Sequence, residues 1–217
     1  MNPISNISRS RYQFDPREYS TQSVIISLIP PCAKSILDVG CNNGYVGLNS
    51  SLNEAKFYGL DWSDDAIQIA RKTYADVIKV DLNSLAALPW GLKFDCIIFG
   101  DILEHLINPE EVLKNLTKNY LCEGGVVVIS LPNIANYAIR LRLLFGNFDY
   151  QDSGILDRTH LHFYTRKTAQ ELIRKSSLEV LTHRSGASIF GVILKWIPKL
   201  SNLFATSHIF ICKRSCK

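Results

Sequence analysis

Hydrophobic residues along the chain come in short, nearly continuous runs, and the segments between them have helical spacing. The runs are rich in Val and Ile and show little polar alternation, which is typical of parallel strands covered on both faces. They lie at about 36–40, 57–61, 77–81, 95–100 and 126–131, with further strands expected at about 179–184 and 208–213. The pattern therefore predicts an α/β fold built on a mostly parallel sheet.

Proline, glycine and capping residues delimit the helices that the pattern predicts. Pro30 and Pro31 end a first amphipathic helix over Glu18–Ile29. Further helices are expected after Gly44, over Asp64–Tyr74, and from Asn108-Pro109 to the run Glu123-Gly124-Gly125. An amphipathic segment, Ile189–Phe204, separates the last two strands.

The first predicted strand stops abruptly at a glycine-rich turn, Gly40-Cys41-Asn42-Asn43-Gly44. Glycine, and more rarely Asn, adopts the positive φ that lets a backbone approach a ligand closely. The dinucleotide fingerprint would need glycine at positions 42 and 45, which hold Asn42 and Tyr45. The turn therefore suits a ribosylated ligand without a pyrophosphate, and S-adenosylmethionine is such a ligand.

Carboxylates end the next two strands. Asp61 follows Gly40 by 21 positions, the separation at which an acidic side chain meets ribose hydroxyls on the neighbouring strand. Asp81 could accept from the adenine amino group, with Leu82 packed near the ring. The alternative for both carboxylates is plain turn formation, with Ser63 and Asp64 capping the following helix.

The segment Leu37–Gly44 resembles the first motif of class I S-adenosylmethionine-dependent methyltransferases, and Phe94–Leu106 resembles their fourth. The resemblance implies a Rossmann-like sandwich with a seven-stranded, mostly parallel sheet whose last strand is antiparallel. It also implies S-adenosylmethionine as the cofactor and S-adenosylhomocysteine as its product. The cofactor-binding residues expected are Asp38, Gly40, Asn42, Gly44, Asp61, Trp62, Asp81, Leu82, Gly100 and Asp101.

We predict a single domain over residues 1–217, with a helical cap at 1–31 and an acceptor-site insertion at 132–164. The insertion far exceeds the roughly 2 to 6 residues usual for a connection in an α/β unit. It mixes Phe148, Tyr150, Phe163 and Tyr164 with hydrogen-bonding side chains, as a pocket for a polar ligand would. Parts of it also resemble a methyltransferase branch associated with cell-surface polysaccharide assembly, which suggests a saccharide or other small polar acceptor.

Three histidines are candidates for catalysis: His105, His160 and His162. A hydroxyl acceptor must lose a proton as it attacks, and an imidazole suits that task. His160 and His162 would share one face of an extended segment, so one could be the base and the other its orienter. Alternatively, Asp157, Arg158 and His160 only hold the loop to the domain. We predict no metal site, because two histidines and Asp157 alone are a weak ligand signal.

Composition and net charge indicate which classes of acceptor and which cell compartment to expect. A net charge of +4 without a basic stripe makes nucleic acid an unlikely acceptor. The cysteines form no C-x-x-C pair, and no apolar run reaches the length of a membrane span, so we predict a cytoplasmic protein. Trp196 and its neighbours could touch a membrane surface. A non-catalytic S-adenosylmethionine-binding module and a nucleotide-dependent oxidoreductase remain alternatives, and the oligomeric state is open.

Overall fold

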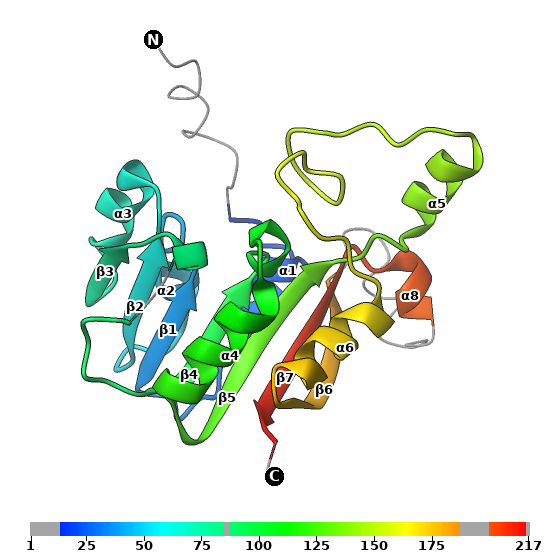
Figure 1. Ribbon diagram of the computed structural model, residues 1–217. Coiled ribbons are helices and arrows are strands. Elements are labelled where there is room, and N and C mark those ends of the chain that lie inside the picture. Colours follow the sequence, from blue (N-terminus) through cyan, green and yellow to red (C-terminus); the bar gives the residue numbers. More distant parts are fainter. Residues whose placement is uncertain (1–13, 85–86, 187–199, 216–217) are drawn as a thin grey trace.

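The computed structural model describes residues 14–84, 87–186 and 200–215. One seven-stranded sheet has the order β3-β2-β1-β4-β5-β7-β6. Its strands are β1 (Ser35–Val39), β2 (Lys56–Asp61), β3 (Asp76–Lys79), β4 (Phe94–Gly100), β5 (Leu121–Pro132), β6 (Leu178–Gly186) and β7 (Ser207–Arg214). Only β7 runs antiparallel to its neighbours β5 and β6. The predicted seven-stranded, mostly parallel sheet with an antiparallel last strand is confirmed (Figure 1).

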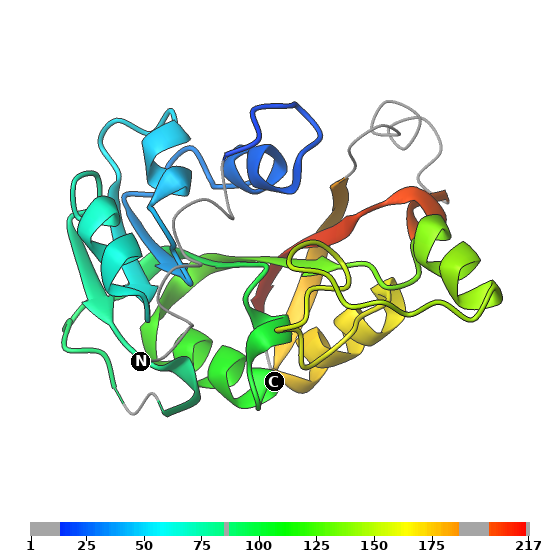
Figure 2. The ribbon, with the colours of Figure 1, turned by 90° about the horizontal axis from the view of Figure 1, so that it is seen from above.

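Helices cover both faces of the sheet, as Figure 2 shows from above. The described helices are α1 (Thr21–Ser27), α2 (Tyr45–Asn49), α3 (Asp64–Ala70), α4 (Pro109–Tyr120), α5 (Tyr137–Leu144), α6 (Arg166–Lys175) and α8 (Ser201–Phe204), with 3₁₀ turns η2 (Leu82–Ser84) and η3 (Leu103–His105). One core cluster joins α1, α2 and α3 to the sheet, and the other joins α4 and α6 to its opposite face. Within β1, Ile36 faces the first cluster and Leu37 the second, so both faces of the strand are apolar.

Some boundaries differ from the predicted ones. The helix that opens at Asn108-Pro109 ends at Tyr120, and the Gly124-Gly125 pair lies inside β5. Gly124 has a φ of +75°, and the β4–β5 register shifts between Phe94 and Cys96. A glycine with positive φ serves an irregular strand as well as a helix end, which is why the sequence was ambiguous there. The first helix begins after Ser20, whose side chain accepts from the Ser23 N–H, rather than at Glu18.

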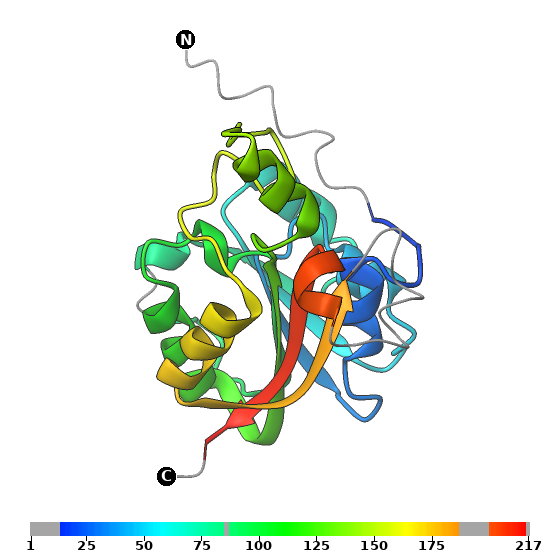
Figure 3. The same cartoon turned by 90° about the vertical axis from the view of Figure 1, so that its right-hand side faces the viewer.

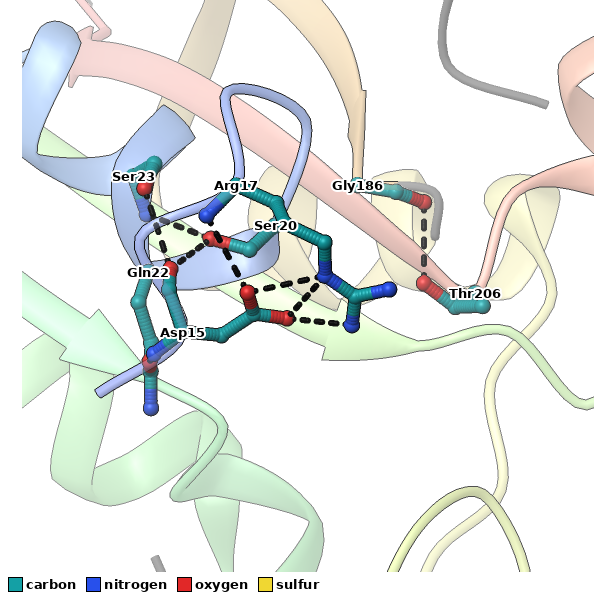
Figure 4. A network of polar contacts seen from close by, with 7 residues as sticks. All are labelled: Asp15, Arg17, Ser20, Gln22, Ser23, Gly186 and Thr206. Carbon is teal, nitrogen blue, oxygen red and sulfur yellow. Dashed lines mark hydrogen bonds and ion pairs between the residues drawn. The ribbon is translucent and has the colours of Figure 1, made fainter. Parts of the chain in front are cut away.

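The chain before α1 is held by polar contacts, which Figure 4 shows. Arg17 makes a bidentate ion pair with Asp15, and the backbone carbonyl of Asp15 accepts from the hydroxyls of Ser20 and Ser23. In the same view, Thr206 donates its hydroxyl hydrogen to the Gly186 carbonyl. Of the predicted cap over 1–31, positions 1–13 lie outside the described residues, as do Trp196 and most of the segment 189–204.

A histidine pair on β6 and β7, partly buried at His183 and fully buried at His208, predicts acid sensitivity. His183 Nε2 lies 3.1 Å from His208 Nδ1, and burial lowers the pKa of His183 to about 3 and that of His208 to about 4. The unfolded chain takes up protons below an ordinary pKa of about 6.5, while the folded chain does not until well below that value. The free energy of unfolding should therefore fall, by on the order of 2 kcal/mol, as the pH drops from 7 to about 4.5.

Urea unfolding at both pH values measures this effect, with His208→Gln as the comparison. The variant keeps a polar side chain of similar size but removes one of the two titrating groups. It should lose a large part of the pH dependence, whereas the carboxylates contribute equally to both proteins. Identical pH dependence in wild type and variant would contradict the assignment.

Candidate active site

The carboxyl ends of β1, β2 and β4 meet at one edge of the sheet, because these strands are parallel neighbours. The glycine turn follows β1, Asp61 ends β2, and Asp101 follows β4. In open α/β sheets, ligands bind outside the carboxyl ends of the strands, where the strand order reverses. The predicted cofactor residues therefore follow the strands at the edge where a ligand is expected, the same end of the sheet at which the loop that carries α5 lies (Figures 1 and 3).

The glycine turn has the predicted left-handed backbone. Gly40, Asn42 and Gly44 have φ values of +75°, +47° and +73°. The N–H groups of Gly40 and Cys41 both donate to the Leu60 carbonyl, which ties the turn to β2. A Cβ on Gly40 would lie 2.8 Å from Ile102, so glycine is also required for packing there. Asn42 thus replaces the usual glycine without changing the sense of the turn.

Asp61 holds the turn from the neighbouring strand. Its Oδ2 accepts from the Asn42 N–H at 2.8 Å, and its Oδ1 accepts from the N–H groups of Trp62 and Ser63. A carboxylate has about four acceptor directions, of which these three N–H groups use two on Oδ1 and one on Oδ2, so Oδ2 can still accept from a ribose hydroxyl. Trp62 beside it is 73% exposed and offers a free indole face. These residues fit the ribose and adenine of S-adenosylmethionine.

Asp38 does not lie in the exposed position expected of a residue that contacts the cofactor. It is buried, and its Oδ2 accepts from the Tyr74 hydroxyl at 2.6 Å. That hydroxyl in turn accepts from the Gly47 N–H. Burial raises the pKa of Asp38 to about 7, against the opposing effect of the Tyr74 hydrogen bond. Asp38 lies in the core beneath the turn, where it supports α2 rather than presenting a free carboxylate to a ligand.

Removing the Tyr74 hydroxyl should therefore destabilise the protein. Tyr74→Phe leaves the buried Asp38 oxygen and the Gly47 N–H without this partner, which should cost about 1 to 3 kcal/mol in the free energy of unfolding. Tyr58→Phe is a matched control, because the Tyr58 ring packs edge-on against Trp90 and Phe94 and makes no hydrogen bond with described residues. Urea denaturation measures both. Equal stability of the two variants would show that the Asp38–Tyr74 bond contributes nothing.

The remaining predicted cofactor residues fall into two groups. Asp81 is exposed and accepts from the Asn83 N–H, while Leu82 is buried in the core. Gly100 ends β4, and Asp101 after it has a φ of +49°. The Ser130 hydroxyl donates to Asp101 Oδ1 and accepts from the Asp101 N–H. Burial raises the pKa of the Asp101 carboxyl.

A cluster of Glu104, His105 and His160 lies just beyond Asp101. Glu104 is fully buried, and its Oε1 is 3.9 Å from His160 Nε2. The rings of His105 and His160 meet edge to face with centroids 4.7 Å apart. The backbone carbonyl of Glu104 accepts from the N–H groups of Leu161 and His162, so the insertion is fastened to η3 at this point. We call these three side chains the Glu-His-His cluster.

Hydrogen bonds fix the tautomers of both rings. His160 Nδ1 lies 3.1 Å from the Ile155 carbonyl, which can only accept. His105 Nδ1 faces the Thr159 carbonyl, and also the Thr159 hydroxyl, whose own hydrogen goes to Asp157. Both Nδ1 atoms must therefore donate, and each Nε2 carries a lone pair in the neutral ring. Burial lowers the pKa of both histidines and raises that of Glu104.

His162 does not join this cluster. Its Nε2 faces the Ile107 carbonyl at 3.4 Å, and its ring lies beside Tyr164. The predicted pairing of His160 with His162 is wrong, because Leu161 between them lies in a bend and the His160 ring lies against His105 of η3 instead. The partner of His160 is His105, from a different part of the chain. Glu104 stood in the fourth motif, but sequence spacing could not place it against a histidine more than fifty residues away.

The insertion closes on itself and carries an aromatic cluster. Asn133 and Tyr164 form an isolated bridge, so the two ends of the insertion lie together. Phe148 packs edge-on against Tyr150 and Phe163, and Phe163 lies near His160. Phe148 and Tyr150 are 37% and 53% exposed. Tyr164 is buried in the main core, so its predicted place in a pocket wall is wrong.

A family model described as a methyltransferase domain matches residues 15–183. The chain belongs to this family. It is a class I S-adenosylmethionine-dependent methyltransferase, an enzyme, and S-adenosylmethionine is its cofactor. Membership in a methyltransferase family contradicts the oxidoreductase alternative.

Curated relatives of this methyltransferase differ in what they act on. The chain is 29% identical to a ubiquinone biosynthesis O-methyltransferase of Glaesserella parasuis over 53% of this chain and 52% of that protein. It is 27% identical to the Azoarcus enzyme of the same name, over 67% of each. Identity to a tRNA U34 carboxymethyltransferase of Campylobacter jejuni is 36%, over 44% of this chain and 34% of that protein. The chain thus spans from a third to two thirds of these relatives, and none of them supports the polysaccharide branch.

Solved structures agree on the fold of the methyltransferase. Magnesium protoporphyrin IX methyltransferase of Synechocystis, with S-adenosylhomocysteine bound, is 14% identical and has a TM-score of 0.63 over 95% of this chain and 90% of that one. A methyltransferase of Clostridium acetobutylicum has a TM-score of 0.62 at 14% identity, over 94% of each chain. Among the described helices, none is long and apolar enough to cross a membrane.

Proposed function

We propose that this methyltransferase transfers the methyl group to a hydroxyl oxygen of a small polar acceptor, with a saccharide as the first candidate. The observation that carries the proposal is the Glu-His-His cluster beside Asp101, at the carboxyl edge of the sheet. Its two Nε2 atoms are lone-pair acceptors held by backbone carbonyls. A hydroxyl needs such a group, because its oxygen must lose a proton as it attacks. The two O-methyltransferase relatives support oxygen as the acceptor atom.

The chemistry asks little else of the protein. S-adenosylmethionine supplies a sulfonium whose methyl carbon is already a strong electrophile. The chain's own residues bind the cofactor through the glycine turn, Asp61 and Trp62, and place the acceptor in line behind the methyl group. In the proposed step the acceptor O–H proton passes to His160 Nε2 as the new C–O bond forms and the C–S bond breaks. Glu104, at 3.9 Å, would stabilise the resulting imidazolium.

A saccharide suits the surroundings of the cluster. The exposed faces of Phe148 and Tyr150 can stack on a sugar ring, and polar groups can read its hydroxyls. Arg158 is exposed and paired with Asp152 at 2.8 Å, so it could exchange this surface partner for an acceptor. The described cysteines are free thiols, and we place the reaction in the cytoplasm on that account. An RNA acceptor is disfavoured by the small net charge of +4.

A panel of defined acceptors tests the proposal. The protein is incubated with methyl-labelled S-adenosylmethionine and, separately, with monosaccharides, sugar nucleotides, polyhydroxyl phenols, amines and carboxylic acids. Label should appear in a hydroxyl acceptor as a methyl ether, identified by NMR and stable to base. Label found only as a methyl amine or a base-labile ester would overturn oxygen transfer to a hydroxyl.

A further inference from the structure

We propose that the Glu-His-His cluster is a binding site for a divalent first-row transition cation such as Zn²⁺. Each of the three side chains offers one ligand atom, and these atoms lie within 4.8 Å of one another. Ligand atoms around a tetrahedral Zn²⁺ are about 3.3 Å apart, given metal–ligand bonds of about 2.0 to 2.1 Å. Small side-chain rotations that move each ligand atom by up to about 1 Å would bring the three atoms to this spacing around an ion.

The independent evidence for a ligand is the state of Glu104. Both of its carboxylate oxygens are fully buried, and neither accepts a hydrogen bond from the described residues. Its separation from His160 Nε2, 3.9 Å, is too long for a hydrogen bond. A buried carboxylate is strongly unfavourable unless it is paired or coordinates a metal. A cation between Glu104 and the two imidazoles would satisfy it.

The histidines are already arranged as metal ligands are. A ligating histidine usually donates its other ring N–H to a backbone carbonyl or a carboxylate, which fixes the ring and its tautomer. His160 donates from Nδ1 to the Ile155 carbonyl, and His105 from Nδ1 to Thr159, which is held in turn by Asp157. Both Nε2 lone pairs are thus left for a metal. This second layer of contacts has no counterpart at His162, whose Nε2 faces the Ile107 carbonyl.

The donor set selects the kind of cation. Two imidazoles and one carboxylate suit Zn²⁺, Fe²⁺ or Mn²⁺, whereas Mg²⁺ prefers oxygen ligands alone. Three protein ligands leave at least one position open, as in catalytic rather than structural sites. His105 is only partly buried, so that position can be reached from solvent.

The role of the cation rests on the proposed function, although its binding does not. An acceptor hydroxyl at the open position would be held by the cation and its pKa lowered, so its proton could leave to water before the methyl group arrives. His160 would then be a ligand instead of the base. The same three residues would act in either mechanism, proton transfer to His160 or activation of the acceptor by a bound cation. Whether methyl transfer depends on a metal distinguishes the two.

Isothermal titration of the chelator-treated full-length protein with Zn²⁺ tests the site. We expect one site in the wild type that Glu104→Gln weakens by about 30-fold or more, since a charged ligand becomes a neutral one. His162→Gln is the matched control and should bind Zn²⁺ like the wild type. Co²⁺ in place of Zn²⁺ should give visible d–d absorption without a thiolate charge-transfer band, which excludes the cysteines as ligands.

Thermal unfolding provides a second readout that does not depend on activity. Zn²⁺ should raise the melting temperature of the wild type and leave that of Glu104→Gln unchanged. Should Glu104→Gln fail to fold, His160→Gln takes its place in both measurements. Equal Zn²⁺ affinity in wild type and variant, or no site at all, would overturn the proposal. In that case methyl transfer to hydroxyls through His160 would still stand, so the two claims fail separately.

Discussion

Replacing Asp61 by alanine is expected to weaken binding of S-adenosylhomocysteine by about 2 kcal/mol or more, roughly 30-fold, because charge-assisted hydrogen bonds to the ribose are lost. The side chain also accepts from three backbone N–H groups, including that of Asn42 in the glycine turn. Its removal should therefore loosen the turn as well as delete a ligand contact. Calorimetric titration with S-adenosylhomocysteine measures the affinity.

A control variant at the opposite edge of the sheet separates the loss of the ribose contact from the loosening of the turn. Asp95, near the start of β4, accepts from the N–H groups of Lys34 and Ser35 and so has a similar structural task. Asp95→Ala should lose stability without losing cofactor affinity. If a folded Asp61→Ala protein binds S-adenosylhomocysteine as tightly as the wild type, Asp61 does not contact the ribose, and the cofactor site must be placed elsewhere along the edge.

The second large effect concerns turnover. His160→Ala should reduce the rate of methyl transfer by roughly 100-fold or more, whether His160 takes the proton itself or holds a cation that acidifies the acceptor. Affinity for S-adenosylhomocysteine should change little, because His160 is not among the residues of the glycine turn or Asp61. Single-turnover kinetics with labelled S-adenosylmethionine measure the chemical step directly.

A purely structural role for His160 predicts a different outcome. His160 Nδ1 donates to the Ile155 carbonyl, so the side chain also helps to hold the insertion. If that were its only task, His160→Ala would lower the melting temperature and weaken acceptor binding, while the chemical step at saturating acceptor would keep its rate. His160→Gln, which keeps a donor to the Ile155 carbonyl, would then restore activity.

Most of the fold could be predicted from the sequence, because its signals are local. Buried parallel strands read as continuous apolar runs, and a glycine turn followed by Asp61 marks the first two strand ends. The prediction that Gly124-Gly125 ends a helix was wrong, because a glycine with positive φ occurs in an irregular strand as well as at a helix end. The same signals predicted the carboxyl edge of the sheet as the cofactor site, but not that Asp38, on the same face of β1 as Ile36, is buried and accepts from the Tyr74 hydroxyl.

The Glu-His-His cluster was only partly predictable from the sequence. His105 and His160 were both candidates, but His160 was paired with His162, because the turns over residues 155–159 that place it against His105 have no strong sequence signal. Glu104 carried no sign of its isolation, since burial without a hydrogen bond is a property of the packed structure. Tyr164 was predicted to line a pocket, but its bridge to Asn133 at the other end of the insertion places it in the core.

Transfer of label from methyl-labelled S-adenosylmethionine to separated cellular pools tests the central claim most directly. The enzyme is incubated with glycan, small-molecule, lipid, RNA and protein fractions, and the labelled linkage in each is identified. We predict label in the glycan or small-molecule pool, carried as a methyl ether and absent with the His160→Ala variant. Label confined to RNA or protein would contradict the assignment of a small hydroxyl acceptor.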